Sequence, residues 1–246
     1  MNRNARDRGQ APAGEKLHGR RKGRPLRAAQ QRALDELGPR LAIATSPAGT
    51  TFDPFAQFET RPRAIWLEIG FGAGEHLIAQ AQANPDVGFI GAEVFQDGVA
   101  KMLRRLEQAQ IDNVRLYQDD ARALLAALPD ATLERTFTLF PDPWPKTRHH
   151  KRRLVQQAYL DDVARVLRDG GELRLATDDP SYQRWMAIEL TRHPAFEWTA
   201  RSPRDWRMRS ADWPPTRYEE KAIAAGRRPV YLRYRRAPRG NARNDQ

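Results

Sequence analysis

The sequence predicts an α/β fold, a mostly parallel sheet with helices on both of its faces. Short apolar runs rich in β-branched and aromatic residues alternate along the chain with segments in which apolar residues recur at helical spacing. A glycine-rich stretch follows the first apolar run and leads directly into a helical pattern, as in the turn between a parallel strand and its crossover helix. The 246 residues suffice for one domain with extensions, and no internal repeat interrupts this order.

Six strands and five helices are expected from these patterns. The strands cover residues 64–69, 87–94, 113–117, 135–140, 171–177 and 229–234, and the helices cover 75–83, 97–109, 121–128, 151–168 and 181–192. The helix over 151–168 has the clearest pattern, because Val155, Tyr159 and Val163 follow one another at helical spacing. We expect it to stop at Gly170–Gly171, since glycine readily adopts the left-handed conformation of a helix cap.

The chain is strongly basic. It carries a formal net charge of +11 and has an isoelectric point near 10.5. A basic surface raises the local concentration of phosphates and steers their approach, so nucleic acid is the first candidate partner. The alternative is a basic protein whose charge is simply solvated.

Much of this charge lies in the N-terminal region. Residues 1–30 hold nine Lys or Arg against two acids, Asp7 and Glu15, and almost no large apolar side chain. We therefore expect residues 1–35 to be an arm that is disordered unless bound, followed by one domain over 36–236 and a disordered basic tail over 237–246. Two roles for the arm stay open: it grips RNA, or it only keeps the protein soluble.

The sequence contains no cysteine. This excludes disulfides, thiolate zinc sites, iron–sulfur clusters and every cysteine nucleophile. The five histidines show no HExxH or comparable ligand spacing, so we expect no metal. No apolar run has the length of a membrane span, and the N-terminus lacks the apolar core of a signal peptide, which indicates a soluble cytoplasmic protein.

The glycine-rich stretch is WLEIGFGAGEHL, in which Gly70, Gly72 and Gly74 follow Glu68. Glycines there allow a tight turn and let a ligand approach the backbone closely. A dinucleotide-binding loop would have glycine at the place of Glu75, and Glu68 would repel a pyrophosphate. A carboxylate at the position of Glu68 suits a cationic ligand without phosphate, such as S-adenosylmethionine.

Further acids follow the second and third expected strands. Glu93 ends the second strand, where doubly wound folds place an acid that accepts hydrogen bonds from ribose hydroxyls. The pair Asp119 and Asp120 follows the third strand, where a side chain can reach an adenine edge. Together with Glu68, these acids predict an S-adenosylmethionine pocket at the carboxyl edge of the sheet. The alternative is that they are turn residues and helix caps, above all Asp119 or Asp120.

The fourth strand leads into the sequence FPDPWPKTRHHKRR, which frames a single acid between prolines. Each proline fixes its own φ and favours extended geometry for the residue before it, so Phe140, Asp142 and Trp144 are all constrained. An acid held beside an aromatic ring suits a planar base, which can stack on the ring and donate N–H groups to the carboxylate. For Trp144 alone, burial in the core is the favoured interpretation.

A run of basic side chains follows directly: Lys146, Arg148, His149, His150, Lys151, Arg152 and Arg153. At the start of the expected helix, the macrodipole would disfavour each cation by roughly 0.3–1 kcal/mol. A bound phosphate backbone explains this placement, so we expect the RNA contacts to come from Arg148, Lys151, Arg152 and Arg153. A solvated run of charge is the alternative.

The absence of cysteine narrows the chemistry of such a pocket. Methylation at the five-position of pyrimidines by the covalent route needs a cysteine nucleophile, and radical methylation needs a cysteine-held cluster. Direct methyl transfer to a nitrogen or oxygen remains, and guanine N7 needs no general base because it carries no proton. Asp142 would then orient the base and stabilise the positive charge that develops on it, while in-line positioning supplies most of the rate.

Five segments together resemble a known family: EIGFGAGEHL, GAEVF, FPDPWPKTRHHKRR, LATDD and TRYEEKAIAAG. They are similar to the bacterial tRNA (guanine-N7)-methyltransferases over roughly residues 60–235, and the proline-framed acid with its basic run is the most specific of them. The resemblance implies a Rossmann-like class I methyltransferase fold with a seven-stranded sheet. It also implies S-adenosylmethionine as donor and the guanine at position 46 of the tRNA variable loop as acceptor.

The resemblance further implies roles for single residues. Glu68, Glu93, Asp120 and Asp142 would line the donor pocket beside the glycine turn, and Asp142 would also be catalytic. The substrate would be bound by Lys146, Asp178, Thr216, Arg217, Tyr218 and Glu219. Taken alone, Thr216 and Glu219 have the spacing of a capping box at a helix start.

Two rival functions stay open. The first is a methyltransferase that acts on another base or on ribosomal RNA, since similar loops also serve exocyclic amines. The second is a non-catalytic RNA-binding protein that retains the nucleotide fold without the activity. The sequence also leaves open the tRNA species and the oligomeric state, with a monomer favoured.

Overall fold

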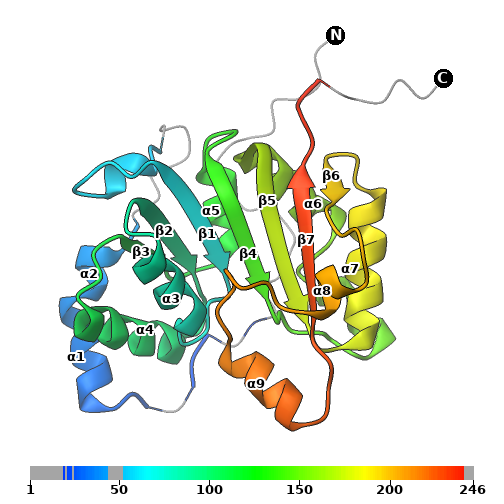
Figure 1. The fold of residues 1–246 in the computed structure, drawn as a ribbon. Coiled ribbons are helices and arrows are strands. Elements are labelled where there is room, and N and C mark those ends of the chain that lie inside the picture. The colour runs from blue at the N-terminus through cyan, green and yellow to red at the C-terminus, as the bar shows by residue number, and fades with distance from the viewer. Residues whose placement is uncertain (1–18, 20, 24, 44–51, 241–246) are drawn as a thin grey trace.

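A seven-stranded sheet crosses the protein (Figure 1). The structure, a computed structural model, describes residues 19, 21–23, 25–43 and 52–240. The strands are β1 Ala64–Ile69, β2 Val87–Ala92, β3 Val114–Tyr117, β4 Leu133–Leu139, β5 Leu167–Thr177, β6 Phe196–Trp198 and β7 Val230–Arg236. Their order is β3-β2-β1-β4-β5-β7-β6, and neighbours are parallel except β7, which runs antiparallel to β5 and β6. The predicted α/β fold with a mostly parallel sheet is confirmed.

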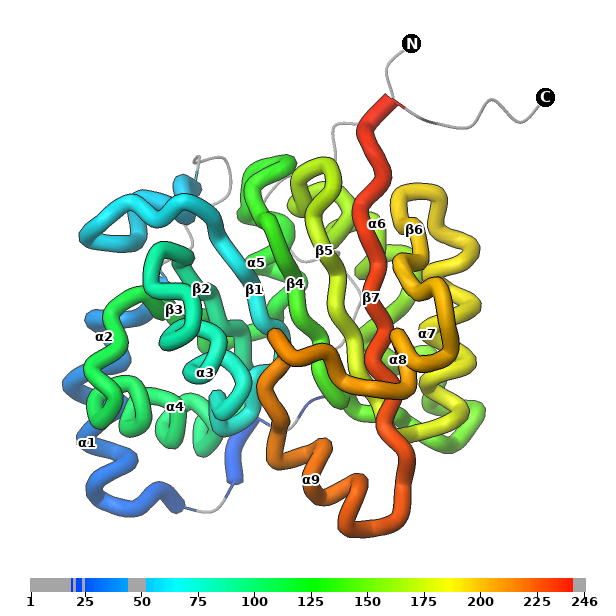
Figure 2. The backbone as a smooth tube through the Cα atoms, viewed as in Figure 1, coloured from blue at the N-terminus to red at the C-terminus, as the bar shows by residue number. Residues whose placement is uncertain are grey.

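Helices cover both faces of this sheet (Figure 1, Figure 2). The α-helices are α1 Ala28–Glu36, α2 Gly38–Leu41, α3 Glu75–Ala83, α4 Gln96–Ala109, α5 Ala121–Ala127, α6 Gln157–Val166, α7 Pro180–Arg192, α8 Arg204–Arg207 and α9 Arg217–Ala224. Two 3-10 helices span Phe55–Gln57 (η1) and Thr147–Arg152 (η2). Helices α3 and α4 pack on one face together with α1, whereas α5, α6 and α7 pack on the other, so each face has its own core.

The central strands are apolar on both faces because each face is covered. All six residues of β1 are buried. Ile65, Leu67 and Ile69 belong to the core on the side of α5 to α7, and Trp66 belongs to the core on the side of α3 and α4. Burial of both faces explains why these strands appear in the sequence as continuous apolar runs rather than alternating ones.

Part of the expected N-terminal arm is folded. Helix α1 includes residues 28–35 of the arm that we expected to be disordered, and it lies along α4 (Figure 1). Ala33 is buried in the same core as Leu103 of α4, and Gln30 Nε2 donates to Asp97 Oδ1 at 3.1 Å. The prediction of a disordered arm is wrong for this helix because these contacts fix it. Residues 1–18 and 241–246, where the rest of the arm and most of the tail were predicted, lie outside the described residues.

The helix expected over 151–168 starts later than predicted. Lys151 and Arg152 belong to η2, and α6 begins only at Gln157. Between them, Arg153 and Val155 are buried, 2% and 0% exposed. This connection fills the core without being helical, so Val155 matched the helical spacing by coincidence.

The same helix also ends earlier than predicted. It stops at Val166, and Leu167 already pairs with β4. Gly170 and Gly171 lie inside β5, in an irregularity of the register that precedes the pairing of Glu172. Gly170 has a φ of +75°, so glycine shapes a bulge here and does not cap a helix.

Candidate active site at the carboxyl edge of the sheet

Predicted site residues follow each of the carboxyl ends of β1 to β5, which meet at one edge of the sheet. In Figure 1 this is the lower edge, and α9 lies beside it. The glycine turn follows β1, and the acids Glu93, Asp120, Asp142 and Asp178 follow β2, β3, β4 and β5 in turn. The parallel topology thus brings together acids that are far apart in the sequence, at the edge where such sheets bind ligands.

The glycine turn connects β1 to α3. Gly70, Gly72 and Gly74 have φ values of +74°, +59° and +81°, a region that residues with a Cβ disfavour. A Cβ on Gly74 would lie 2.0 Å from Met102 Sδ, so α4 packs too closely against the turn to allow one. Gly74 is also the N-cap of α3, which therefore starts directly from the turn.

Glu93 ties the end of β2 to the glycine turn. Its Oε2 accepts a hydrogen bond from Gly72 N, and its Oε1 accepts one from Phe95 N, both at 2.9 Å. Burial raises the pKa of Glu93, the bonds from Phe95 and Gly72 oppose the rise, and the charge of Asp142 adds to it. Glu93 is thus a buried acid close enough to Asp142 for the two charges to interact.

Glu68 is directed into the interior. It is 5% exposed, and its Oε2 lies 2.7 Å from Nδ1 of His76, which is also buried. His76 lies on α3 and packs edge-on against Phe137 of β4, with ring centroids 4.8 Å apart. The Glu68–His76 pair therefore fixes α3 against β1. His76 was not singled out from the sequence because a lone histidine without ligand spacing carries no signal.

Asp119 and Asp120 both make contacts within the chain. Asp120 is the N-cap of α5: its Oδ1 accepts a bond from Arg122 N at 3.0 Å, and its Oδ2 pairs with Arg122 Nη2 at 2.6 Å. Burial alone would raise the pKa of Asp120, but the bonds from Arg122 together with the charges of Arg122 and Arg21 lower it. Asp119 pairs with Arg21 at 2.9 Å. The helix-cap interpretation of Asp120 is confirmed, and its contact with an adenine stays a prediction.

An N-terminal strap crosses the ends of β2 and β3; we define it as Gly19 with residues 21–23 and 25–27. Arg21 O accepts a hydrogen bond from Gln96 N at 3.0 Å, in addition to the pair between the Arg21 side chain and Asp119. A Cβ on Gly23 would lie 2.9 Å from the ring of Phe95, so the strap packs directly on that side chain. Nothing in the sequence pattern distinguished this segment from the rest of the basic arm.

The proline-framed loop after β4 presents Asp142 to solvent. Phe140 and Trp144 have φ values of +51° and +43°, so both adopt left-handed geometry in place of the extended geometry expected before a proline. Two bonds hold the loop: Phe140 N donates to a β5 carbonyl at 2.8 Å, and Pro143 O accepts from Arg153 Nε at 2.9 Å. Strained backbone of this kind persists only where surrounding contacts fix it, and it is concentrated at functional sites.

Arg153 is buried, so the prediction that it contacts RNA is wrong. Its Nη2 donates to Ser181 Oγ at 2.7 Å, and its guanidinium lies 4.9 Å and 5.2 Å from the ring centroids of Tyr182 and Trp185. Together with the bond to Pro143 O, these contacts brace the Asp142 loop from within the protein. The sequence pattern does not separate this arginine from its exposed neighbours.

The rest of the basic run lies nearer the surface. Lys146, Arg148 and Lys151 are exposed on and beside η2, and Arg152 is half-buried with its guanidinium 5.0 Å from the Trp144 ring centroid. Trp144 is itself half-buried, so its expected burial in the core is wrong. Because the run ends before α6 begins at Gln157, it does not lie at the N-terminus of the expected helix, and the macrodipole argument for its placement does not hold.

The TRYE stretch begins α9 with the predicted capping box. Glu219 N donates to Thr216 Oγ1 at 3.0 Å, and Thr216 N donates to Glu219 Oε2 at 3.4 Å. Glu219 is 4% exposed, and its Oε1 accepts further bonds from Tyr231 Oη at 2.6 Å and Arg209 Nε at 2.9 Å. These contacts engage the Glu219 carboxylate in the interior, where it anchors α9 to β7.

Arg217 and Tyr218 lie on the exposed side of α9. A Cβ on Gly72 would lie 3.3 Å from the Tyr218 ring, so this ring lies against the glycine turn. Partial burial raises the pKa of Tyr218, and the charges of Glu93 and Asp142 raise it further. We call Gly72, Glu93, Asp142 and Tyr218 the edge cluster.

Asp178, the acid after β5, is half-buried and pairs with Arg227 at 2.5 Å. Arg227 follows α9, so this pair connects the end of β5 to the segment that carries Tyr218. The neighbouring Asp179 caps α7 by accepting a bond from Tyr182 N at 2.8 Å.

In the part of the chain that the structure describes, no group of three or more His, Cys, Asp or Glu side chains could hold a metal ion. Among the same residues, no helix combines the length and the apolar character needed to cross a membrane.

Known proteins match the chain over most of its length. Residues 62–232 match the family described as "Putative methyltransferase". The chain is 55% identical to the tRNA (guanine-N(7)-)-methyltransferase of Rhodospirillum rubrum over 226 residues, which are 91% of this chain and 89% of that protein. It is 46% identical to the protein of the same name from Paramagnetospirillum magneticum, over 97% of this chain and 100% of that protein.

Solved structures share the fold. The crystal structure of the 16S rRNA methyltransferase KamB aligns with a TM-score of 0.56 at 14% identity, over 80% of this chain and 99% of that one. The aminoglycoside resistance methyltransferase NpmB1 aligns with a TM-score of 0.51 at 16% identity, over 79% and 98%. At such low identity these matches establish the class I methyltransferase fold alone. The family follows from the curated relatives, which share about half of their residues with this chain over nearly its whole length: the protein belongs to the bacterial tRNA (guanine-N7)-methyltransferases.

Proposed function

We propose that this protein transfers a methyl group from S-adenosylmethionine to N7 of the guanine at position 46 in the variable loop of tRNA. The observation that carries the proposal is the edge cluster, in which Gly72, Glu93, Asp142 and Tyr218 lie together at the carboxyl edge of the sheet. The names of the relatives from Rhodospirillum rubrum and Paramagnetospirillum magneticum support guanine N7 in tRNA as the acceptor.

The residues at this edge fit the donor. A Cβ on Gly70 would meet no atom within 4 Å, so a ligand has room beside the turn. Both oxygens of the Glu93 carboxylate accept backbone bonds and keep further lone-pair capacity for a ribose hydroxyl. Glu93 and Asp142 also provide the negative potential that a sulfonium favours. When bound, S-adenosylmethionine supplies the methyl group together with its positive charge and leaves as a neutral thioether.

Asp142 is the proposed catalytic residue. Guanine N7 carries no proton, so the residues need not remove one. The positive charge arrives on the purine, and a fixed carboxylate that accepts bonds from the N–H groups of the base gains strength as that charge develops. The braced loop keeps Asp142 in place for this, since Arg153 holds the adjacent carbonyl of Pro143. The exposed ring of Tyr218 offers a stacking surface for the base.

In this proposal the basic run supplies affinity for the tRNA backbone. Lys146, Arg148 and Lys151 are exposed beside the Asp142 loop, where they can contact phosphates without reading sequence. Arg217, exposed at the start of α9 next to Tyr218, is a further cation available for a phosphate.

Transfer of a labelled methyl group to an unmodified tRNA transcript tests the proposal. After digestion we expect 7-methylguanosine that maps to position 46, and no label in a matched transcript whose guanosine 46 is replaced by adenosine. A methyl group on an exocyclic amine, or label that persists in the substituted transcript, would contradict it.

A further inference from the structure

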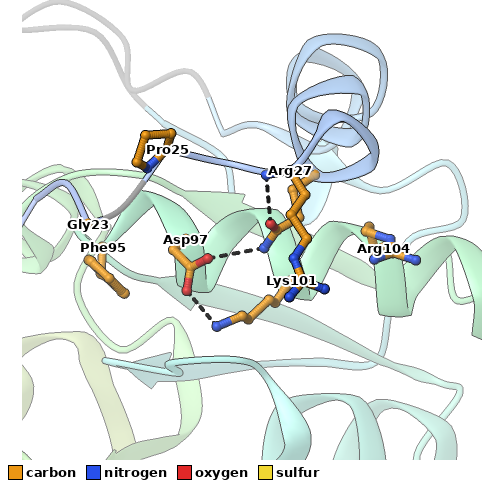
Figure 3. Close-up of a pocket in the computed structure, with 8 residues that line it drawn as sticks. Gly23, Pro25, Arg27, Phe95, Asp97, Lys101 and Arg104 are labelled. Carbon is orange, nitrogen blue, oxygen red and sulfur yellow. Dashed lines mark hydrogen bonds and ion pairs between the residues drawn. The ribbon is translucent and has the colours of Figure 1, made fainter.

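A cavity of about 540 Å³ lies between the N-terminal strap and α4 (Figure 3). Its lining comes from the strap, from α1 and from the start and outer side of α4: Gly23, Pro25, Arg27, Gln30, Phe95, Asp97, Lys101 and Arg104. The volume lies within the range of small-molecule sites, roughly 300–1,000 Å³. None of these residues belongs to the edge cluster.

Cationic side chains outnumber acids around this cavity. Asp97 is the acid, and it already pairs with Lys101 at 2.5 Å and accepts a bond from Gln30. Within the described part of the chain, neither Arg27 nor Arg104 has a carboxylate at ion-pair distance. Figure 3 shows Arg27 at the end of the strap, and Lys101 and Arg104 on α4, among the residues that line the cavity. The cavity therefore offers two guanidinium groups without an acidic partner.

The lining is held in place by bonds and packing. Arg27 N donates to Gln30 Oε1 at 3.1 Å, which fixes the end of the strap at the start of α1. The Phe95 ring packs against Gly23, and the backbone N–H of Phe95 donates to Glu93. The cavity is thus a formed feature, and Phe95 in its lining follows Glu93 of the edge cluster by two residues.

We infer that this cavity binds one nucleotide of the tRNA backbone, at a position other than the methylated guanine; this inference rests on the proposed function. Guanidinium groups bind phosphate through paired N–H donors, and a phosphate between Arg27 and Arg104 would satisfy both. The ring of Phe95 provides a surface on which a base or ribose can pack. A polymer is favoured over a single small anion, because the residues that precede Gly23 in the sequence include Arg3, Arg6, Arg8, Lys16, Arg20, Arg21 and Lys22 against two acids.

The test compares two double variants with the same change in charge. Arg27→Gln with Arg104→Gln removes the two guanidinium groups, and Arg184→Gln with Arg192→Gln removes two exposed ones from α7, on the other flank of the sheet. Anisotropy measures the affinity of each full-length protein for unmodified tRNA over a series of salt concentrations, with S-adenosylhomocysteine present. We expect the cavity variant to bind roughly tenfold more weakly, with a log–log salt slope smaller by about one unit, the loss of one neutralised phosphate. Equal slopes and affinities in the two variants would overturn the inference.

Further measurements distinguish this inference from a failure of the proposed function and from binding of a free nucleotide. Because binding needs no turnover, a wild-type protein that fails to make 7-methylguanosine would overturn the proposed function and leave the salt comparison valid. Guanosine monophosphate is titrated in parallel: if it stabilises the wild type but not the cavity variant, while the tRNA slopes agree, the cavity binds a free nucleotide and the inference is wrong. Arg104→Gln alone repeats the test if the double variant melts early, and Arg104→Lys, which keeps the charge, should restore the slope.

Discussion

Replacement of Arg153 by methionine tests whether a member of the basic run supports the Asp142 loop instead of the RNA. Methionine keeps apolar contact with the Tyr182 and Trp185 rings but removes the bonds to Pro143 O at 2.9 Å and Ser181 Oγ at 2.7 Å. A hydrogen bond from a charged group contributes about 1.5–3 kcal/mol, and the retained ring contacts recover part of the sum. We expect the free energy of unfolding to fall by about 3 kcal/mol, which lowers the thermal midpoint by roughly 6–12 °C for a chain of this size.

The same variant should also lose turnover. With Pro143 O released, Asp142 is no longer held in one position, and misplacement by about 1 Å can cost up to about a hundredfold in rate. The salt slope of tRNA binding should stay at the wild-type value, because Arg153 is buried. Lys151→Met is the matched control from the same run: we expect a slope smaller by about one unit and a stability change within about 0.5 kcal/mol. If Arg153→Met flattened the slope and left the melting temperature unchanged, the burial argument would be refuted.

Three further predictions concern the acids. Asp142→Asn should lower kcat by roughly a hundredfold or more, because an electrostatic stabiliser is removed, while tRNA affinity stays within about twofold because the phosphate contacts remain. A near-normal rate in single-turnover assays would assign the residue another role. Burial raises the pKa of Glu93, so on acidification this carboxyl is protonated at a higher pH than an exposed glutamate. Protonation by itself favours the folded state, but it removes an acceptor for the ribose. Donor affinity measured by calorimetry should therefore fall through that step in the wild type, and Glu93→Gln should bind weakly and without the step. Asp212 pairs with Arg174 at 2.6 Å. Burial by itself would raise the pKa of Asp212, but the bonds from Arg174 and Ser210 together with the charges of Arg174 and Arg135 lower it to about 2. Its contribution to stability is therefore present above the ordinary carboxyl range and is lost as the pH falls through 2. Asp212→Asn should cost about 1 kcal/mol at neutral pH after allowance for its exposure, and urea unfolding curves of variant and wild type should converge near pH 2; a constant difference would contradict the assignment.

The sequence predicted the elements whose burial leaves a pattern and missed those that bury little. Residues 64–69 form β1 as predicted, because a strand covered on both faces is a continuous apolar run. Strand β6 has three residues, of which only Phe196 is buried, so no pattern marks it. Helix α1 buries only Gln30 and Ala33, which is too little for an apolar stripe.

The sequence predicts the location of the site, because the sheet topology decides which residues lie at its carboxyl edge. Acids that follow parallel strands must meet at one edge of the sheet, so the strand pattern alone predicts that Glu93 and Asp142 lie near each other. The direction of each side chain depends on partners that packing supplies from elsewhere in the sequence. Glu68 bonds to His76, Glu219 to Tyr231, and Arg153 to residues of α7, and no local pattern encodes these pairings.

Strand β7 lies between β5 and β6 although it follows both in the sequence. While the chain is being synthesised, β5 must therefore expose an unpaired edge, and β6 has no neighbour, until β7 has left the ribosome. An open edge of this kind is a template for association with other chains. The nascent protein can assemble its glycine turn and the Asp142 loop early, but the sheet closes only by insertion of a late strand, which makes the interval before β7 leaves the ribosome the period of greatest risk of aggregation.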